Sequence, residues 1–154
     1  MVANKIEYFA RLLVYSSPEI RESILEIFAY LSDKSDRVKE LCLNSFRFVD
    51  RIFATITHGF GTSEKQAQLA CFIINNIAQL GEPALKLFKK YERTLALVSF
   101  NDEALSPITS GLLFSLSGRE QDGEKKESAA VANMRMNLRN DMEDESNSEM
   151  LDSS

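Results

Sequence analysis

The stretch Phe72-Ile-Ile-Asn-Asn-Ile-Ala-Gln-Leu-Gly81 places two asparagines side by side in the most apolar run of the chain. Asparagine disfavours a helix interior, because its amide competes for nearby backbone groups. Apolar side chains nevertheless recur at helical spacing from Ala67 to Ile77, and Gly81 then stops the run. The stretch therefore predicts the end of a helix in which some other interaction offsets the unfavourable helix propensity of the two asparagines.

A similar sequence pattern at the end of an expected helix occurs three times along the chain. The pattern ends three expected helices, each of which begins with a serine cap, and it covers residues 28–32, 74–78 and 113–117. The first residues of the three copies are 46 and then 39 positions apart. A period of about 40–47 residues, with two or three helices per unit, is typical of armadillo and HEAT solenoids, whose units stack on one another. No stretch alternates like a strand. The sequence predicts an all-α fold, an armadillo/HEAT-like α-solenoid of about three repeats.

The individual helices follow from apolar spacing and from capping signals. Ser17-Pro18 and Ser106-Pro107 are each read as an N-cap followed by a proline, and Ser63-x-x-Gln66 is read as a capping box. A break is expected near residues 91–94. The expected helices cover residues 4–15, 17–32, 35–44, 46–58, 63–81, 83–100 and 106–117.

The composition changes after Gly118. Residues 1–118 hold 13 acidic and 13 basic side chains, whereas residues 119–154 hold 10 acidic and 5 basic ones and no aromatic residue. Such a segment cannot bury enough apolar surface to offset the entropy lost on ordering. We therefore expect a helical repeat domain over 1–118 and a disordered acidic tail over 119–154, with at most a transient helix around 128–139.

Composition also limits the chemistry. A neutral body with an acidic tail argues against binding nucleic acid, and the apolar runs fall short of the roughly 20 residues that span a bilayer. Cys42 and Cys71 fit core positions, and one histidine, His58, cannot supply a metal cluster. No phosphate-binding loop or catalytic set is visible. We expect no enzyme activity, no cofactor, no metal and no small-molecule ligand.

The sequence Phe72-x-x-x-Asn76-Ile77-Ala78 resembles the end of the third helix of armadillo repeats. In armadillo proteins that bind extended peptides, this asparagine lines the concave surface and bonds to the peptide backbone. The resemblance implies that Asn76 and Phe72 contact a partner, with Asn75 on a neighbouring polar stripe. The other two repeats carry Tyr30 and Ser115 at this position. The second interpretation is a solvated amide on an exposed helix face, which costs a few tenths of a kcal/mol.

Two longer runs resemble one particular family. The first run is 6–32, and the second is Leu87-Phe-Lys-Lys-Tyr-Glu-Arg-Thr-Leu-Ala-Leu-Val-Ser-Phe100 with the following 106–118. Both are similar to the C-terminal armadillo-like domain of the large ARID subunit of BAF-type SWI/SNF chromatin remodellers, the Osa-like family. The similarity covers roughly 1–118 and lies in distributed apolar and Tyr-Glu-Arg-type positions. The chain departs from the family in a short 59–63 loop, in the acidic tail and in having no ARID domain, so we expect a fragment, a short isoform or a truncated paralogue.

What this family resemblance implies is a role in binding. It implies a nuclear, non-catalytic scaffold in transcription regulation, whose partners are the SWI/SNF core subunits and the ATPase. The alternative is a generic armadillo or HEAT adaptor outside chromatin that binds a peptide or protein around Phe72 and Asn76.

A basic cluster lies along one expected helix, formed by Lys86, Lys89, Lys90 and Arg93. One interpretation is a solvated face whose lysine stems cover apolar neighbours. The other is a docking site for an acidic patch of a partner, which suits a neutral domain better than DNA does. Lys89, Lys90 and Arg93 are accordingly candidate partner-binding residues.

Overall fold

The structure is a computed structural model, and it describes residues 2–57, 62–117 and 131–140. Every regular element in these ranges is a helix and none is a strand, which confirms the all-α prediction. The elements are α1 (Val2–Tyr15), α2 (Pro18–Lys34), α3 (Asp36–Leu43), α4 (Phe46–Thr55), α5 (Glu64–Ala78), α6 (Glu82–Phe88), the 3₁₀ turn η1 (Lys89–Tyr91), α7 (Glu92–Asn101) and α8 (Ser106–Leu116). Residues 131–140 form a further helix.

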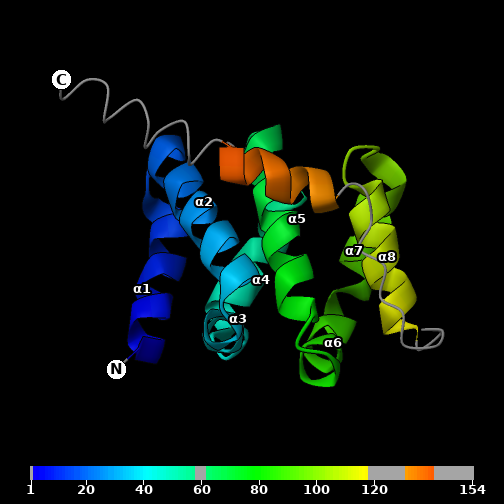
Figure 1. The fold of residues 1–154 in the computed structure, drawn as a ribbon, viewed down its shortest axis with the longest axis horizontal. Coiled ribbons are helices and arrows are strands. Elements are labelled where there is room, and N and C mark those ends of the chain that lie inside the picture. Colours follow the sequence, from blue (N-terminus) through cyan, green and yellow to red (C-terminus); the bar gives the residue numbers. More distant parts are fainter. Residues whose placement is uncertain (1, 58–61, 118–130, 141–154) are drawn as a thin grey trace.

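The helices follow one another along the longest axis of the molecule (Figure 1). The pair α1 and α2 lies at one end, α3 to α5 lie in the middle, and α6 to α8 lie at the other end. Helix α2 packs along α5, which also packs against α4 and α8, while α7 packs along α8. Helix α5 is therefore the element that has neighbours on most of its sides.

Serine side chains begin four of the helices. The hydroxyls of Ser17, Ser35, Ser45 and Ser63 each accept a bond from the backbone N–H three residues further on, at 3.1 to 3.4 Å. The predicted caps at Ser17 and Ser63 are confirmed. The capping box predicted at Ser63 has only one of its two hydrogen bonds, because the side-chain amide of Gln66 bonds to α2 and not to the backbone N–H of Ser63.

The predicted cap at Ser106 is wrong, because Ser106 is the first residue of α8 and caps nothing. The N–H groups of Ile108 and Thr109, from which a Ser106 cap would accept, instead donate to the carbonyl of Leu105 at 3.1 and 3.0 Å. The helix therefore begins one residue earlier than predicted. Just before it, the Oδ1 of Asp102 accepts from the N–H groups of Ala104 and Leu105 at 3.0 and 3.2 Å. The predicted break in the 83–100 helix is present as η1.

Gly81 separates α5 from α6, as the sequence predicts. Its φ of 88° lies in the region that side chains disfavour, and its N–H donates to the carbonyl of Ala78 at 3.0 Å. The same residue then precedes α6 as its N-cap. One glycine thus reverses the chain between two helices.

One buried cluster runs through all the helices and holds the array together. At the α1 end, the ring of Phe28 lies between those of Phe9 and Phe48, with centroids 5.3 and 4.8 Å apart. Cys42 and Cys71 are fully buried in the same cluster, which confirms their predicted core positions. Phe28 therefore joins three helices, α1, α2 and α4.

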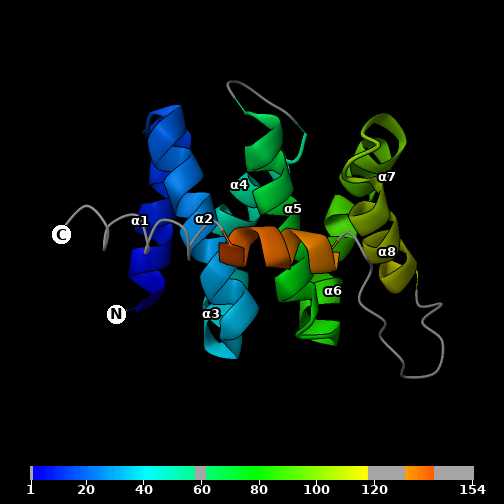
Figure 2. The ribbon, with the colours of Figure 1, turned by 45° about the horizontal axis from the view of Figure 1, so that its top comes forward.

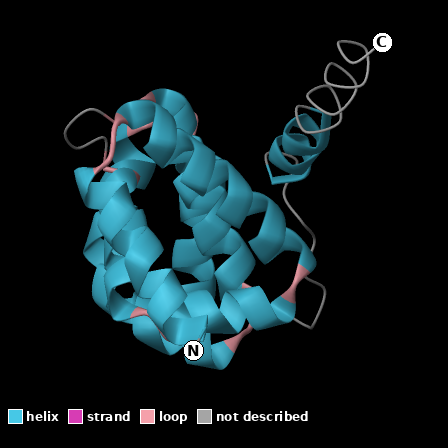
Figure 3. Cartoon of the chain, turned by 90° about the vertical axis from the view of Figure 1, so that its left-hand side faces the viewer, coloured by secondary structure: helices cyan, strands magenta, loops and turns pink. Residues whose placement is uncertain are grey.

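Part of the predicted disordered tail is instead ordered. Residues 131–140 are helical and cross in front of α2 and α5 (Figure 2), on the outer side of the bundle when it is viewed along its long axis (Figure 3). Val131 and Leu138 are buried against the core. The sequence predicted at most a transient helix around 128–139, whereas the structure gives residues 131–140 a packed helix, because their apolar residues share one helix face. The remainder, 119–130 and 141–154, lies outside the described residues.

Candidate functional site

Two buried amides join α5 to α2. The Nε2 of Gln66 donates to the carbonyl of Pro18 at 3.0 Å, near the start of both helices. Towards their ends, the Nδ2 of Asn76 donates to the Oγ of Ser32 at 3.0 Å and lies 3.4 Å from the carbonyl oxygen of Ala29. The contact between these two helices is thus fixed by polar groups at both ends as well as by apolar packing.

These bonds explain why Asn76 is tolerated in α5. Asn76 is only 1% exposed, so the interpretation as a solvated amide is wrong, and the amide does not lie open to a peptide in this structure. A helix interior penalises asparagine by a few tenths of a kcal/mol, whereas one intramolecular hydrogen bond contributes about 1 kcal/mol. The amide is kept because it bonds to the neighbouring helix.

Phe72 is also buried, and Asn75 beside Asn76 is half-buried. The guanidinium carbon of Arg135 lies 5.9 Å from the centre of the Phe72 ring. The surface that the sequence offered to a partner around Phe72 is therefore covered by residues 131–140 of the same chain. As described, neither Phe72 nor Asn76 is open to contact.

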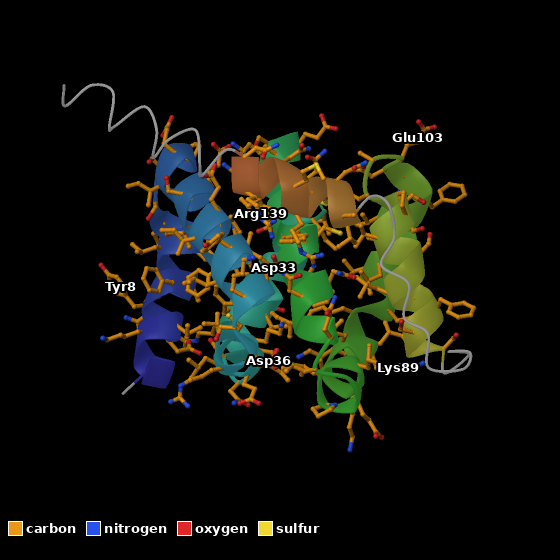
Figure 4. All side chains as sticks on the ribbon, viewed as in Figure 1. Tyr8, Asp33, Asp36, Lys89, Glu103 and Arg139 are labelled. Atoms are coloured by element: carbon orange, nitrogen blue, oxygen red, sulfur yellow. The ribbon has the colours of Figure 1, made fainter. Side chains whose placement is uncertain are left out.

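Residues 131–140 are held by an ion pair as well as by apolar contacts. The Nε of Arg135 donates to the Oδ1 of Asp33 in α2 at 2.7 Å, and the Asp33 side chain is only 9% exposed. We call the surface formed by Asp33 of α2 and by Leu69 and Phe72 of α5 the α2–α5 face. Figure 4 shows Asp33 and Arg139 on the same side of the molecule, in the region where residues 131–140 cross it.

A pocket of about 460 Å³ lies between α5 and the 131–140 helix. It is lined by Glu64, Lys65, Gln68, Leu69 and Phe72 from α5 and by Met134, Asn137 and Leu138 from the covering helix. Its walls are therefore mainly side chains of two helices that are distant in the sequence.

The basic candidates lie elsewhere, on η1 and at the start of α7. Lys89 pairs with Glu92 at 3.0 Å and donates to the last carbonyl of α8, that of Leu116, at 3.3 Å. The Lys90 ammonium lies 3.8 Å from the centre of the Phe46 ring, and Arg93 is exposed. Lys89 lies well away from Asp33 and Arg139 in Figure 4, so the two sets of candidate residues do not form one site.

Sequence reasoning missed Tyr91 and Asp50, which lie next to this basic surface. The Tyr91 hydroxyl donates to the Oδ1 of Asp50 at 3.1 Å, and its ring stacks on Phe53 with centroids 4.0 Å apart. Burial first, and the Asp50 carboxylate second, raise the pKa of Tyr91. No sequence signal links the two residues, which are 41 positions apart.

The two thiols of the described residues are poorly suited to act as nucleophiles. Burial raises the pKa of both the Cys42 and the Cys71 thiols to about 12, so neither is a thiolate near neutral pH. No three His, Cys, Asp or Glu side chains in the described ranges are grouped to hold a metal, and His58 lies outside those ranges. Within them no helix is both long and apolar enough to cross a bilayer.

Exposed apolar side chains gather at the two ends of the array. At the α1 and α2 end they include Tyr8, which points outward in Figure 4, and Tyr15, which is 85% exposed. At the α7 and α8 end they include Leu97, Phe114 and Phe100, which is 89% exposed. Between these ends, the described parts of α3 to α6 expose one large apolar side chain, Phe46.

Comparison of the chain with protein-family models, with curated proteins and with solved structures finds no match.

Proposed function

We propose that this protein is a non-catalytic protein interaction scaffold, built as an armadillo-like solenoid, and that it acts in the nucleus as part of a SWI/SNF-type chromatin remodelling complex in transcription regulation. The resemblance of residues 6–32, 87–100 and 106–118 to the ARID subunit's C-terminal domain supports the choice of complex. The observation that carries the scaffold role is the exposed apolar surface at both ends of the array.

The order of the helices supports the solenoid. Helices α3, α4 and α5 are followed by α6, α7 and α8, an order that suits two successive three-helix units with α2 as the last helix of the unit before. The third helices pack side by side, α2 on α5 and α5 on α8. In a solenoid each unit buries its apolar faces on its neighbours, and this packing follows that rule.

The two ends of the array suit protein contacts. Aromatic side chains as exposed as Tyr15 and Phe100 bury a large area when a partner covers them, and exposed apolar patches mark interaction sites. The described middle of the array lacks a comparable patch. The ends are therefore the surfaces on which we place neighbouring subunits.

The test is to purify the tagged full chain from native nuclear and cytoplasmic extracts and to identify the co-purifying proteins by mass spectrometry. The expected result is a SWI/SNF ATPase with core subunits in the nuclear sample. Recovery of unrelated cytoplasmic partners alone would contradict the assignment and would favour the alternative, a generic armadillo or HEAT adaptor outside chromatin.

Matched variants show which surface is used. Tyr15→Ala and Phe100→Ala each remove an exposed aromatic side chain from one end, whereas Phe46→Ala removes one from the middle. Circular dichroism should show all three to be folded. The end variants are expected to lose co-purifying subunits and Phe46→Ala to keep them. Equal recovery with all three variants would contradict docking at the ends.

A further inference from the structure

The 131–140 helix has one face that contacts the bundle and one that does not. Val131, Met134, Arg135 and Leu138 fall at positions i, i+3, i+4 and i+7, which form one side of a helix. Val131 and Leu138 are buried, Met134 and Arg135 are half-buried, and Met136 on another side is exposed. This segment is thus a short amphipathic helix with an arginine in the middle of its apolar stripe.

The α2–α5 face has two groups suited to an arginine. Asp33 offers a nearly buried carboxylate 2.7 Å from the Arg135 Nε, and the Phe72 ring lies under the guanidinium. A guanidinium pairs with carboxylates through directed hydrogen bonds and is attracted to the face of an aromatic ring. A carboxylate beside an aromatic ring therefore selects arginine over an uncharged side chain.

The covering helix fits this face incompletely. The remaining pocket of about 460 Å³ has Leu69 and Phe72 on one side and Met134 and Leu138 on the other. Glu64, Lys65, Gln68 and Asn137 also line this pocket, which is partly open to solvent. It is therefore a groove beside the covering helix, and a side chain of another helix could enter it.

We infer that the α2–α5 face is a docking site for a short amphipathic helix of a partner protein, one with an arginine between apolar residues, and that residues 131–140 occupy this site in cis as a competitor. This inference rests on the proposed scaffold role and names one of its binding surfaces. A tethered competitor has an effective concentration of up to the order of millimolar, so the partner's helix must bind better than the cis helix to replace it.

The experiment uses the full chain and a fluorescein-labelled peptide of residues 129–142, followed by fluorescence anisotropy. Arg135→Glu breaks the cis ion pair with Asp33, while Arg139→Glu makes the same charge change at an exposed position of the same helix. The Arg135→Glu chain should bind the peptide at least about tenfold more tightly than the Arg139→Glu chain, since releasing the cis helix removes its competition. Circular dichroism should show that both variants are folded.

A charge reversal identifies the residue that receives the arginine. The Asp33→Arg chain should fail to bind the native peptide and should bind a peptide in which glutamate replaces the arginine of position 135. This second variant keeps the test decisive even where Arg135→Glu alters the rest of the chain, because the same folded protein is compared with two peptides.

Two results would overturn the inference. The first is equal affinity of the Arg135→Glu and Arg139→Glu chains for the peptide, including no binding by either. The second is a wild-type dimer, measured by light scattering, that Arg135→Glu converts to a monomer, since this would give the site to the helix of a second copy. Either result leaves the scaffold role itself to be decided by the co-purification.

Discussion

Helices α5 and α8 have the same predicted sequence pattern at their ends and pack against each other, yet they are buried to very different extents. Ten of the fifteen residues of α5 are buried, against four of the eleven in α8. Helix α5 packs against α2, α4 and α8 and is crossed by residues 131–140, whereas α8 lies at one end of the array. Position in the array, rather than the apolar pattern of each helix, therefore determines which side chains are shielded from water.

The residues that the sequence pattern aligns, at positions 30, 76 and 115, show this difference one by one. Tyr30 in α2 is exposed, and the Ser115 hydroxyl in α8 donates to a carbonyl of its own helix, that of Gly111, at 3.2 Å. Asn76 in α5 is buried and bonds to another helix. A polar residue at this position thus becomes structural only where a neighbouring helix covers it.

The comparison is tested most strongly by removing a phenylalanine from each helix. Phe72→Ala in α5 should lower the free energy of unfolding by about 3–5 kcal/mol, because it leaves a cavity in the core. Phe114→Ala in α8 removes a half-exposed ring and should cost less than about 1 kcal/mol. Urea unfolding of the full chain measures both. Similar losses for the two variants would mean that the ends are packed as tightly as the centre.

A smaller effect is expected at the two adjacent asparagines. Asn76→Ala removes the bond to Ser32 and should cost about 1–3 kcal/mol. Asn75→Ala is its control, since Asn75 is half-buried and should cost no more than about 0.5 kcal/mol. The same urea titration applies. Equal costs would contradict the structural role assigned to Asn76.

Alkaline pH should also reveal the burial of α5. The Cys71 thiol has its pKa raised from 9.0 to about 12, so above pH 9 the unfolded chain loses this proton while the folded chain keeps it. The contribution to stability is complete below pH 9 and is lost as the pH rises towards 12. Between pH 8 and pH 10 the wild type should lose on the order of 1 kcal/mol more unfolding free energy than Cys71→Ala. Parallel losses in the two proteins would show that the thiol is not shielded.

The smallest effect is expected at the surface between α4 and η1. Lys90→Ala removes the ammonium from the face of Phe46 and should cost about 0.5–1 kcal/mol. The control is Lys86→Ala, which removes an exposed lysine and should change stability by no more than about 0.5 kcal/mol. Thermal unfolding of the two variants, compared at one salt concentration, measures the difference. If Lys86→Ala costs as much, the contact with Phe46 contributes nothing of its own.

Much of the local structure could be predicted from the sequence. The serines at 17 and 63, the glycine at 81 and the apolar spacing between them act within a few residues, so they indicate where helices begin and end. The exception at Ser106 is also local, since the carbonyl of Leu105 accepts from the N–H groups that a Ser106 cap would have used. Short-range competition of this kind is visible in a sequence only when every candidate acceptor is weighed.

The candidate site could not be predicted in the same way. The bonds from Asn76 to Ser32, from Tyr91 to Asp50 and from Arg135 to Asp33 join residues 44, 41 and 102 positions apart. A residue's type and spacing show that it can form such a bond, but not which partner the packing brings within hydrogen-bond distance. The segment 131–140 was underestimated for this reason, because its apolar stripe is short and gains stability only from the face it covers.

The sequence by itself determined the helical class, the positions of most helix ends and the burial of Cys42 and Cys71, because capping, glycine conformation and apolar periodicity are local properties. The tertiary structure decided that Asn76 faces a neighbouring helix, that Phe72 lies beneath residues 131–140 and that the exposed aromatic side chains collect at the two ends. These features depend on which helix has neighbours on both sides, and only the packed array supplies that order.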